Sequence, residues 1–235
     1  MYRSMLNLRN VGVCYLSRAG LLRRDRFWAL RDVSFDLYRG ETLGVIGRNG
    51  AGKTTLLKTL AGILKPDRGQ MTSDGSQVML LSMPLGFVPY LSGRDNVVLS
   101  GLLLGESRRV MISKMEEIIV FSELGDFIDQ PVYSYSAGMK ARLGFSIAFH
   151  TNPDIILIDE VLGVGDASFR QKSTAAMRAR VRSDKTVVLV SHSEVAIRNL
   201  CDRVVWIENG ESQIEGPTEE VLQCYHSYLT HGAKE

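Results

Sequence analysis

The sequence predicts an α/β fold: a mostly parallel sheet with N-terminal antiparallel strands and an inserted helical lobe. Three observations predict it. Short apolar runs alternate with longer stretches of helical periodicity, the pattern of βα units around a parallel sheet. One run, Ile155–Ile158, is apolar at every position, as expected of a central strand covered on both faces. The first 40 residues instead alternate apolar and polar side chains, as in residues 6–8 and 33–37, which indicates antiparallel strands.

The composition is that of one globular chain. Its 235 residues are 45% apolar and 23% charged, which excludes a disordered or collagen-like protein. We expect a single domain over residues 1–235, with an inserted helical subdomain at about 85–150 and a short helical tail at about 217–235. The net charge of +2 gives no support for binding nucleic acid through charge. Three cysteines without a CxxC pair indicate neither a disulfide framework nor a zinc site.

The remaining elements follow from periodicity and from the residues that begin and end helices. The predicted strands of the parallel sheet are Thr42–Ile46, Val78–Leu81, Ile155–Ile158, Thr186–Val190 and Val204–Glu208. The predicted helices are Lys53–Ala61, Arg108–Phe121, Ala137–His150, Ala167–Arg182, Glu194–Leu200 and Glu219–Leu229.

A glycine-rich loop follows the first of these strands. Residues 47–54 read GRNGAGKT and fit GxxxxGK[ST] between a strand and a helix, as that pattern requires. Glycines let backbone N–H groups converge on an anion, and the helix adds its positive N-terminal end. We expect Lys53 to reach the β- and γ-phosphates and the Thr54 hydroxyl to bind Mg²⁺; a glycine-rich turn that matches by chance is the alternative. The predicted phosphate site comprises Gly47, Arg48, Asn49, Gly50, Ala51, Gly52, Lys53, Thr54 and Thr55.

Two further strand ends carry groups that suit phosphate chemistry. Asp159 and Glu160 follow the apolar run Ile155–Ile158, at the edge where α/β sheets bind ligands. We expect Asp159 to hold Mg²⁺ and Glu160 to orient and deprotonate a water molecule. His192 follows the strand Thr186–Val190, where it could contact a γ-phosphate. The alternatives are an acidic pair that only ends a strand and a histidine with a structural role.

With these motifs, the segment YSAGM at 135–139 resembles the signature of the ABC-type ATPases, usually written LSGGQ. Here Tyr, Ala and Met replace Leu, Gly and Gln. Gly165 and Asp166 resemble the D-loop of that family. The resemblance covers residues 1 to about 225 and implies the P-loop NTPase fold with ATP and Mg²⁺ as ligands. The sequence departs from the family at the Q-loop. The family usually has a glutamine there, whereas this sequence has Met83 at about that position.

The signature segment also has a physical interpretation. Ser136 stands where it can cap the predicted helix Ala137–His150, whose positive end could then face an anion. In the family, two subunits pack head to tail, and each signature closes on the γ-phosphate held by the other. The resemblance therefore implies a homodimer that encloses two ATP molecules, with Ser136, Gly138 and Asp166 contacting nucleotide. A serine that merely caps a helix is the alternative.

An aromatic side chain near the N-terminus usually stacks on adenine in this family. Tyr15 is the expected residue because of its place after the first strand, with Phe27 and Trp28 as rivals and core packing as the alternative. Residues 17–27, between the first strands, carry four arginines against a lone aspartate. These arginines could face anionic lipid headgroups or a pyrophosphate-linked sugar, or form a solvated surface loop.

The amino-acid sequences of several segments, such as YSAGMKARLGF and DEVLGVGDASF, resemble those of the ATPase subunits of bacterial polysaccharide exporters. This resemblance implies a peripheral subunit on the cytoplasmic face of the inner membrane that hydrolyses ATP and drives an integral membrane permease. The expected cargo is a polyprenyl-pyrophosphate-linked O-antigen, capsule or teichoic acid chain. The alternatives are another cargo (a drug, a lipid or a peptide), a non-transport ABC ATPase, or a kinase or GTPase that shares only the phosphate loop.

Overall fold

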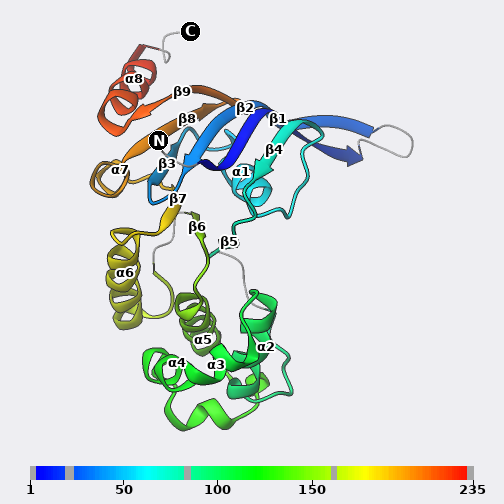
Figure 1. The fold of residues 1–235 in the computed structure, drawn as a ribbon, viewed down its shortest axis with the longest axis vertical. Helices are drawn as coiled ribbons and strands as arrows, with labels where there is room; N and C mark the ends of the chain where they lie inside the picture. Colours follow the sequence, from blue (N-terminus) through cyan, green and yellow to red (C-terminus); the bar gives the residue numbers. More distant parts are fainter. Residues whose placement is uncertain (1–3, 19–23, 82–85, 160–162, 232–235) are drawn as a thin grey trace. The chain divides into compact units, whose positions relative to one another are not determined.

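The computed structural model describes residues 4–18, 24–81, 86–159 and 163–231 (Figure 1). The chain forms two compact units. The first comprises Met1–Leu80, Asp154–Glu160 and Val181–Glu235, and the second comprises Leu81–Pro153 and Val161–Arg180. No helix in the described ranges has both the length and the apolar composition needed to cross a bilayer.

The first unit is built on a mixed sheet that confirms the predicted fold class. Within the described residues the strand order is β4-β1-β2-β9-β8-β3-β7-β6-β5. Neighbours from β8 to β5 run parallel, whereas β1 pairs antiparallel with β2 and β4, and β9 pairs antiparallel with β8. The strands are β1 (Ser4–Arg18), β2 (Arg24–Tyr38), β3 (Thr42–Ile46), β4 (Arg68–Ser73), β5 (Val78–Leu80), β6 (Ile155–Asp159), β7 (Thr186–Val190), β8 (Arg203–Glu208) and β9 (Glu211–Pro217).

Helix α1 (Lys53–Leu60) covers the parallel strands and fixes the position of the loop before it. Leu56, Leu57 and Leu60 are at most 2% exposed and join the core formed by the buried side chains of β3, β6 and β7. Burial of such side chains contributes about 1.5–3 kcal/mol each. The glycine-rich loop therefore joins two elements that are both anchored in the core.

Two further helices complete the first unit. Helix α7 (Glu194–Leu200) begins at Ser193, whose hydroxyl accepts a hydrogen bond from the Ala196 N–H. Helix α8 (Thr218–His231) follows β9 and packs on β8 and β9 (Figure 1). The Thr218 hydroxyl donates to the Cys201 carbonyl at 2.7 Å, which ties the start of α8 to the end of α7.

The second unit is helical. Its core contains buried side chains from α2, α4 and α5, including Val97, Ile118 and Leu143, each 0% exposed. The elements are α2 (Gly93–Leu103), α3 (Arg108–Ser113), α4 (Met115–Ser122), the 3₁₀ turns Gly125–Asp129 and Val132–Ser134, α5 (Ala137–His150) and α6 (Ala167–Val181).

The single helix predicted over Arg108–Phe121 is wrong. The segment forms two helices that are separated at Lys114 (φ −93°, ψ 0°), which ends α3 and precedes α4. At this break the Lys114 ammonium donates to the His150 carbonyl at 2.6 Å, at the C-terminal end of α5. A tertiary contact to a helix-end carbonyl, which has no partner within its own helix, therefore accompanies the break in a sequence whose local periodicity favours one helix.

Candidate functional site

The glycine-rich loop leaves no room for side chains at two of its glycines. Gly47 has φ +150°, and a Cβ there would lie 2.0 Å from the Ile207 carbonyl oxygen. Gly52 has φ +104°, and a Cβ there would lie 2.4 Å from the Ala29 carbonyl oxygen. Both positions therefore require glycine. Because Gly52 supplies no capping side chain, the first N–H groups of α1 stay available to an anion.

Lys53 opens α1 and lies beneath the loop. The residue is 7% exposed, and its ammonium donates to the carbonyl oxygens of Gly47 at 2.7 Å and Arg48 at 2.9 Å. The same Arg48 carbonyl accepts from the Ala51 N–H at 3.2 Å, which closes the loop. A buried cation needs such acceptors, and they hold the ammonium at the place where the loop would wrap a phosphate.

A hydroxyl and a carboxylate meet beside this loop. The Thr54 hydroxyl donates to the carboxylate of Asp159, with Oγ1 and Oδ2 3.2 Å apart, at the end of β6. Mg²⁺ prefers hard oxygen ligands at about 2.0–2.1 Å in octahedral geometry, so neighbouring ligands lie about 3 Å apart. The donor set and its spacing therefore fit Mg²⁺ held between Thr54 and Asp159.

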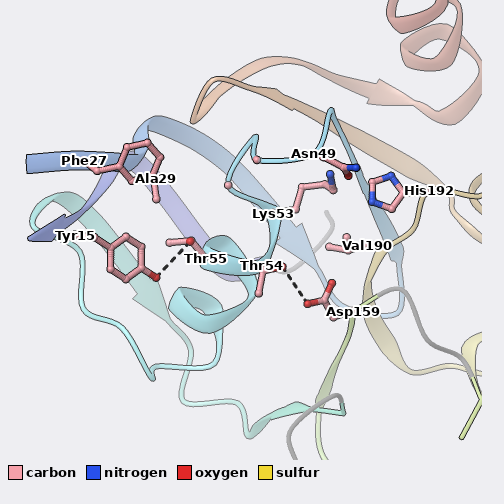
Figure 2. A pocket seen from close by; sticks show the side chains of 12 residues that line it. Tyr15, Phe27, Ala29, Asn49, Lys53, Thr54, Thr55, Asp159, Val190 and His192 are labelled. Carbon is pink, nitrogen blue, oxygen red and sulfur yellow. Dashed lines mark hydrogen bonds between the residues drawn. The ribbon is translucent and has the colours of Figure 1, made fainter. Parts of the chain in front are cut away.

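A cavity of about 400 Å³ lies in the first unit and gathers most of the predicted site (Figure 2). Its wall includes the loop, the start of α1 and the ends of β6 and β7. The lining residues are Tyr15, Phe27, Ala29, Asn49, Gly50, Gly52, Lys53, Thr54, Thr55, Asp159, Val190 and His192. Six of the nine residues predicted for the phosphate site thus line one cavity with Asp159, His192 and Tyr15.

Two aromatic rings stand at one end of the cavity. Tyr15 on β1 and Phe27 on β2 are directly paired across the antiparallel strands, so both side chains lie on one face. Tyr15 is 39% exposed and Phe27 is 60% exposed, and the Tyr15 hydroxyl lies 3.4 Å from the Thr55 hydroxyl (Figure 2). Trp28 instead packs under the Arg68 guanidinium, 4.6 Å from the ring centroid. Tyr15 and its rival Phe27 therefore share the cavity, a pairing that sequence reasoning missed because it depends on strand register.

His192 lies just beyond β7, which pairs with β6 so that Asp159 stands opposite Val190. It is exposed and lines the cavity on the same side as Asp159 (Figure 2). His192 thus lines the same cavity as Lys53, and its contact with a terminal phosphate stays a prediction. Glu160 and Met83 lie outside the described residues, as do residues 19–23 of the arginine-rich segment.

The signature segment belongs to the second unit. Ser136 is the N-cap of α5, and its hydroxyl accepts a hydrogen bond from the Met139 N–H at 3.2 Å, as its sequence position predicts. Apart from the backbone of its own helix, the nearest atom to a Cβ on Gly138 would be the Ser136 hydroxyl oxygen, at 3.8 Å. The N-terminus of α5 thus presents a hydroxyl and an uncrowded backbone, the features expected of an anion contact.

Asp166 precedes α6 and is tied to α5 by a residue that sequence reasoning did not single out. Its carboxylate accepts from the Phe169 N–H at 3.1 Å, and it pairs with the Arg142 guanidinium. The Phe169 backbone N–H, and next Arg142 and Ser168, lower the pKa of Asp166 to about 2. Arg142 also pairs with Glu123 at 3.2 Å. Asp166 is therefore fixed as a carboxylate beside α5.

The sequence is similar to several curated bacterial proteins. It is 45% identical over 203 residues to the ABC transporter protein AbcA of Aeromonas salmonicida, covering 86% of this chain and 66% of the relative. It is 44% identical over 205 residues to the O-antigen export ATP-binding protein RfbB of Klebsiella pneumoniae (87% and 83% covered). It is 46% identical over 203 residues to the teichoic acids export ATP-binding protein TagH of Enterococcus faecalis (86% and 45% covered). The chain thus spans less than two thirds of the length of AbcA and of TagH.

The fold is shared with solved structures. An ATP-binding subunit of an ABC transporter superposes with a TM-score of 0.73 at 20% identity, covering 95% of this chain and 94% of the other. A dimeric ATP-binding cassette with ADP and Pi gives 0.70 at 23% identity, covering 91% and 99%. The sequence pattern of the ABC transporter family matches residues 30–163. The predicted family is confirmed: this chain belongs to the ABC transporter family.

Proposed function

We propose that this chain is the ATP-hydrolysing subunit of an exporter that moves a lipid-linked polysaccharide across the cytoplasmic membrane. The observation that carries the ATPase assignment is the contact between Thr54 and Asp159 beneath the glycine-rich loop, because it joins a phosphate site to a metal site in one cavity. Support for the cargo comes from relatives named for the export of O-antigen and teichoic acids. The carrier lipid, polyprenyl pyrophosphate, follows from the family resemblance of the sequence.

Each residue of the cavity has a distinct role in the proposed reaction. Lys53 and the loop N–H groups bind the phosphates, while Thr54 and Asp159 hold Mg²⁺. Mg²⁺ held by these two residues would supply positive charge to offset that of the phosphates. Glu160 takes a proton from the attacking water, and His192 contacts the γ-phosphate. The rings of Tyr15 and Phe27 stack on the base.

The proposed active form is a homodimer with two-fold symmetry. In it, Ser136, Gly138 and Asp166 of one protomer contact the nucleotide held by its partner, so that ATP bridges the interface. The support is the presentation of Ser136 and the N-terminus of α5 to an anion. Hydrolysis removes the bridging phosphate and loosens the dimer, which couples ATP turnover to a conformational change.

The membrane permease is proposed to dock on the second unit, which contains the expected helical subdomain at about 85–150 and, in addition, Val161–Arg180. This unit exposes Tyr90 (84%), Leu91 (38%) and Tyr133 (63%), here called the tyrosine patch. The two rings lie 6.2 Å apart, and the Tyr133 N–H donates to the Pro89 carbonyl at 2.8 Å. Exposed aromatic side chains held close together favour contact with another protein. In this arrangement the chain is peripheral, on the cytoplasmic face of the membrane.

The ATPase mechanism is tested with Glu160→Gln. If ATP bridges two protomers, this variant loses turnover and forms a stable dimer with Mg-ATP, measured by light scattering. Adding Ser136→Asp keeps a good helix cap but sets a negative charge against the γ-phosphate, so the dimer should be lost while the helix stays intact. A Glu160→Gln protein that turns over ATP at the full rate and stays monomeric contradicts the mechanism.

The cargo is tested separately. The wild-type chain should co-purify from membranes with an integral membrane protein and a pyrophosphate-linked glycan, identified by mass spectrometry. Recovery of the membrane protein with a drug, a peptide or a glycan-free lipid in place of the glycan contradicts the proposed cargo. That result does not affect the ATPase assignment.

A further inference from the structure

The side chain of Arg48 contacts α8, although its backbone belongs to the phosphate loop. The guanidinium carbon lies 4.8 Å from the centroid of the Tyr228 ring. An arginine over a tyrosine face within about 6 Å is a cation–π contact. Arg48 itself is exposed and Tyr228 is half-buried, so the C-terminal helix reaches the loop through one defined pair.

Tyr228 is held in place by the sheet. Its ring lies 4.9 Å from that of Trp206 on β8, and the Tyr225 ring lies 5.4 Å from the same indole. Trp206 is 6% exposed, and its indole N–H donates to the Glu208 carboxylate at 3.5 Å. Trp206 also stands opposite Ile46, the residue before the loop, in the β3–β8 register. Tyr228 therefore contacts both a buried indole and the Arg48 guanidinium.

The Arg48 backbone connects the contact with Tyr228 to the phosphate site. Its carbonyl accepts from the Lys53 ammonium at 2.9 Å and from the Ala51 N–H at 3.2 Å. A side chain pinned at Arg48 thus restricts the carbonyl that orients Lys53. Tyr228 thus contacts the Arg48 side chain, and the Arg48 carbonyl in turn contacts Lys53.

Helix α8 also lines a second cavity that His192 shares with the phosphate site. A cavity of about 240 Å³ is lined by residues of α8, including Leu222 and His226, together with Glu194 and His192. His226 Nε2 lies 2.8 Å from the Glu194 carboxylate, which ties α8 to α7. His192 lines both cavities. Helix α8 therefore adjoins the phosphate site at two places: at the loop, through Arg48, and at His192, through the smaller cavity.

We propose that Tyr228 is a positioning residue for nucleotide binding: it holds Arg48 so that the loop is formed before ATP arrives. This rests on the proposed nucleotide site. Pre-organisation reduces the ordering cost of binding, so its loss weakens affinity. Tyr228 acts through Arg48 and does not itself contact the nucleotide.

The test compares the affinity of variants for Mg-ATP, measured by calorimetry on the full chain. Tyr228→Leu should raise Kd about two- to fivefold, the size of one exposed cation–π contact. Tyr228→Phe keeps the ring and should bind as the wild type does. Tyr225→Leu is the matched control, because it removes the neighbouring ring on Trp206 from the same helix and spares Tyr228. Thermal unfolding shows that the two leucine variants are folded.

A double-mutant cycle separates positioning from a structural role. In an Arg48→Met background, Tyr228→Leu should produce no further rise in Kd. A further rise there, an equal rise with Tyr225→Leu, or wild-type affinity for Tyr228→Leu each overturns the proposal. If the wild-type chain fails to bind Mg-ATP, the nucleotide site itself is wrong, and that result is distinct from a failure of Tyr228 alone.

Discussion

Tyr15 and Phe27 come from two strands and occupy one end of the cavity, with the Tyr15 hydroxyl near Thr55. Two rings on one face offer a base an apolar surface on which it can stack without a specific hydrogen-bond pattern. Since the contact depends on the π-face of the base, it should accept adenine and guanine alike.

The first prediction concerns these two rings. Tyr15→Leu and Phe27→Leu should each weaken ATP binding by about 1–3 kcal/mol, the usual contribution of stacking on one aromatic side chain. GTP binding should weaken to a similar degree. Kd values for both nucleotides check this, with Leu16→Ala, an exposed neighbour on β1, as the control. Unchanged affinity in both ring variants would show that the base binds elsewhere.

The glycine-rich loop was predictable from sequence because its residues are contiguous and two of its glycines are required sterically, although Gly47, Arg48 and Ala51 do not line the cavity. Asp159 and His192 were predictable from their places at strand ends, and the cavity contains both. The Tyr15–Phe27 pair and the Arg48–Tyr228 contact were not, because each depends on which distant strand or helix lies alongside. Local pattern does not specify such partners.

Helix α5 carries a different kind of group at each end. Ser136 caps its N-terminus, and His150 occupies its last turn, packed edge-on against Phe121 at 5.5 Å and Phe149 at 5.4 Å. His150 Nδ1 donates to the Ser146 carbonyl at 2.7 Å. Burial lowers the pKa of His150 below its ordinary value, so the helix ends on a neutral ring.

The second prediction follows from that pKa. Below about pH 6.5 the unfolded chain protonates this histidine while the folded chain resists it, so the unfolded state binds more protons. The free energy of unfolding should therefore fall as the pH drops from 7 toward 5, and His150→Phe should fall less steeply. Urea unfolding at several pH values measures both slopes. Identical slopes would mean that His150 titrates alike in both states.

Among the strands, the buried ones were predictable from sequence and two exposed ones were not. The strands β3, β6 and β7 are apolar runs with buried residues, and all three were located from sequence. Strands β4 and β9 were missed because they are polar and mostly exposed, so no apolar pattern marks them. The break at Lys114 was missed because its partner, the His150 carbonyl, is distant in sequence.

At the level of the whole molecule, the fold could be predicted from the short phosphate-binding and signature motifs, although overall sequence identity to solved structures is low. Solved structures only 20–23% identical share the fold over nearly the whole chain. In this chain the loop, the strand-end aspartate and the histidine lie together because they follow β3, β6 and β7, which are neighbours in the parallel part of the sheet.

The third prediction concerns the permease contact. Tyr90→Glu and Tyr133→Glu place charge in the tyrosine patch, so they should abolish co-purification of the membrane subunit while ATP hydrolysis by the isolated chain continues. Leu103→Glu, also in the second unit and 72% exposed, is the control and should leave the contact intact. Retention of the membrane subunit by both tyrosine variants would place the contact elsewhere.

Thr54 and Thr55 are adjacent on the first turn of α1, yet their hydroxyls meet partners at opposite ends of the cavity, Asp159 and Tyr15. Because the two residues share one helical turn, their two attachments are coupled through a single short piece of backbone. In the proposed ATPase, we therefore expect the first turn of α1 to link the phosphate end of the cavity directly to the base, so that loss of the terminal phosphate weakens both contacts together.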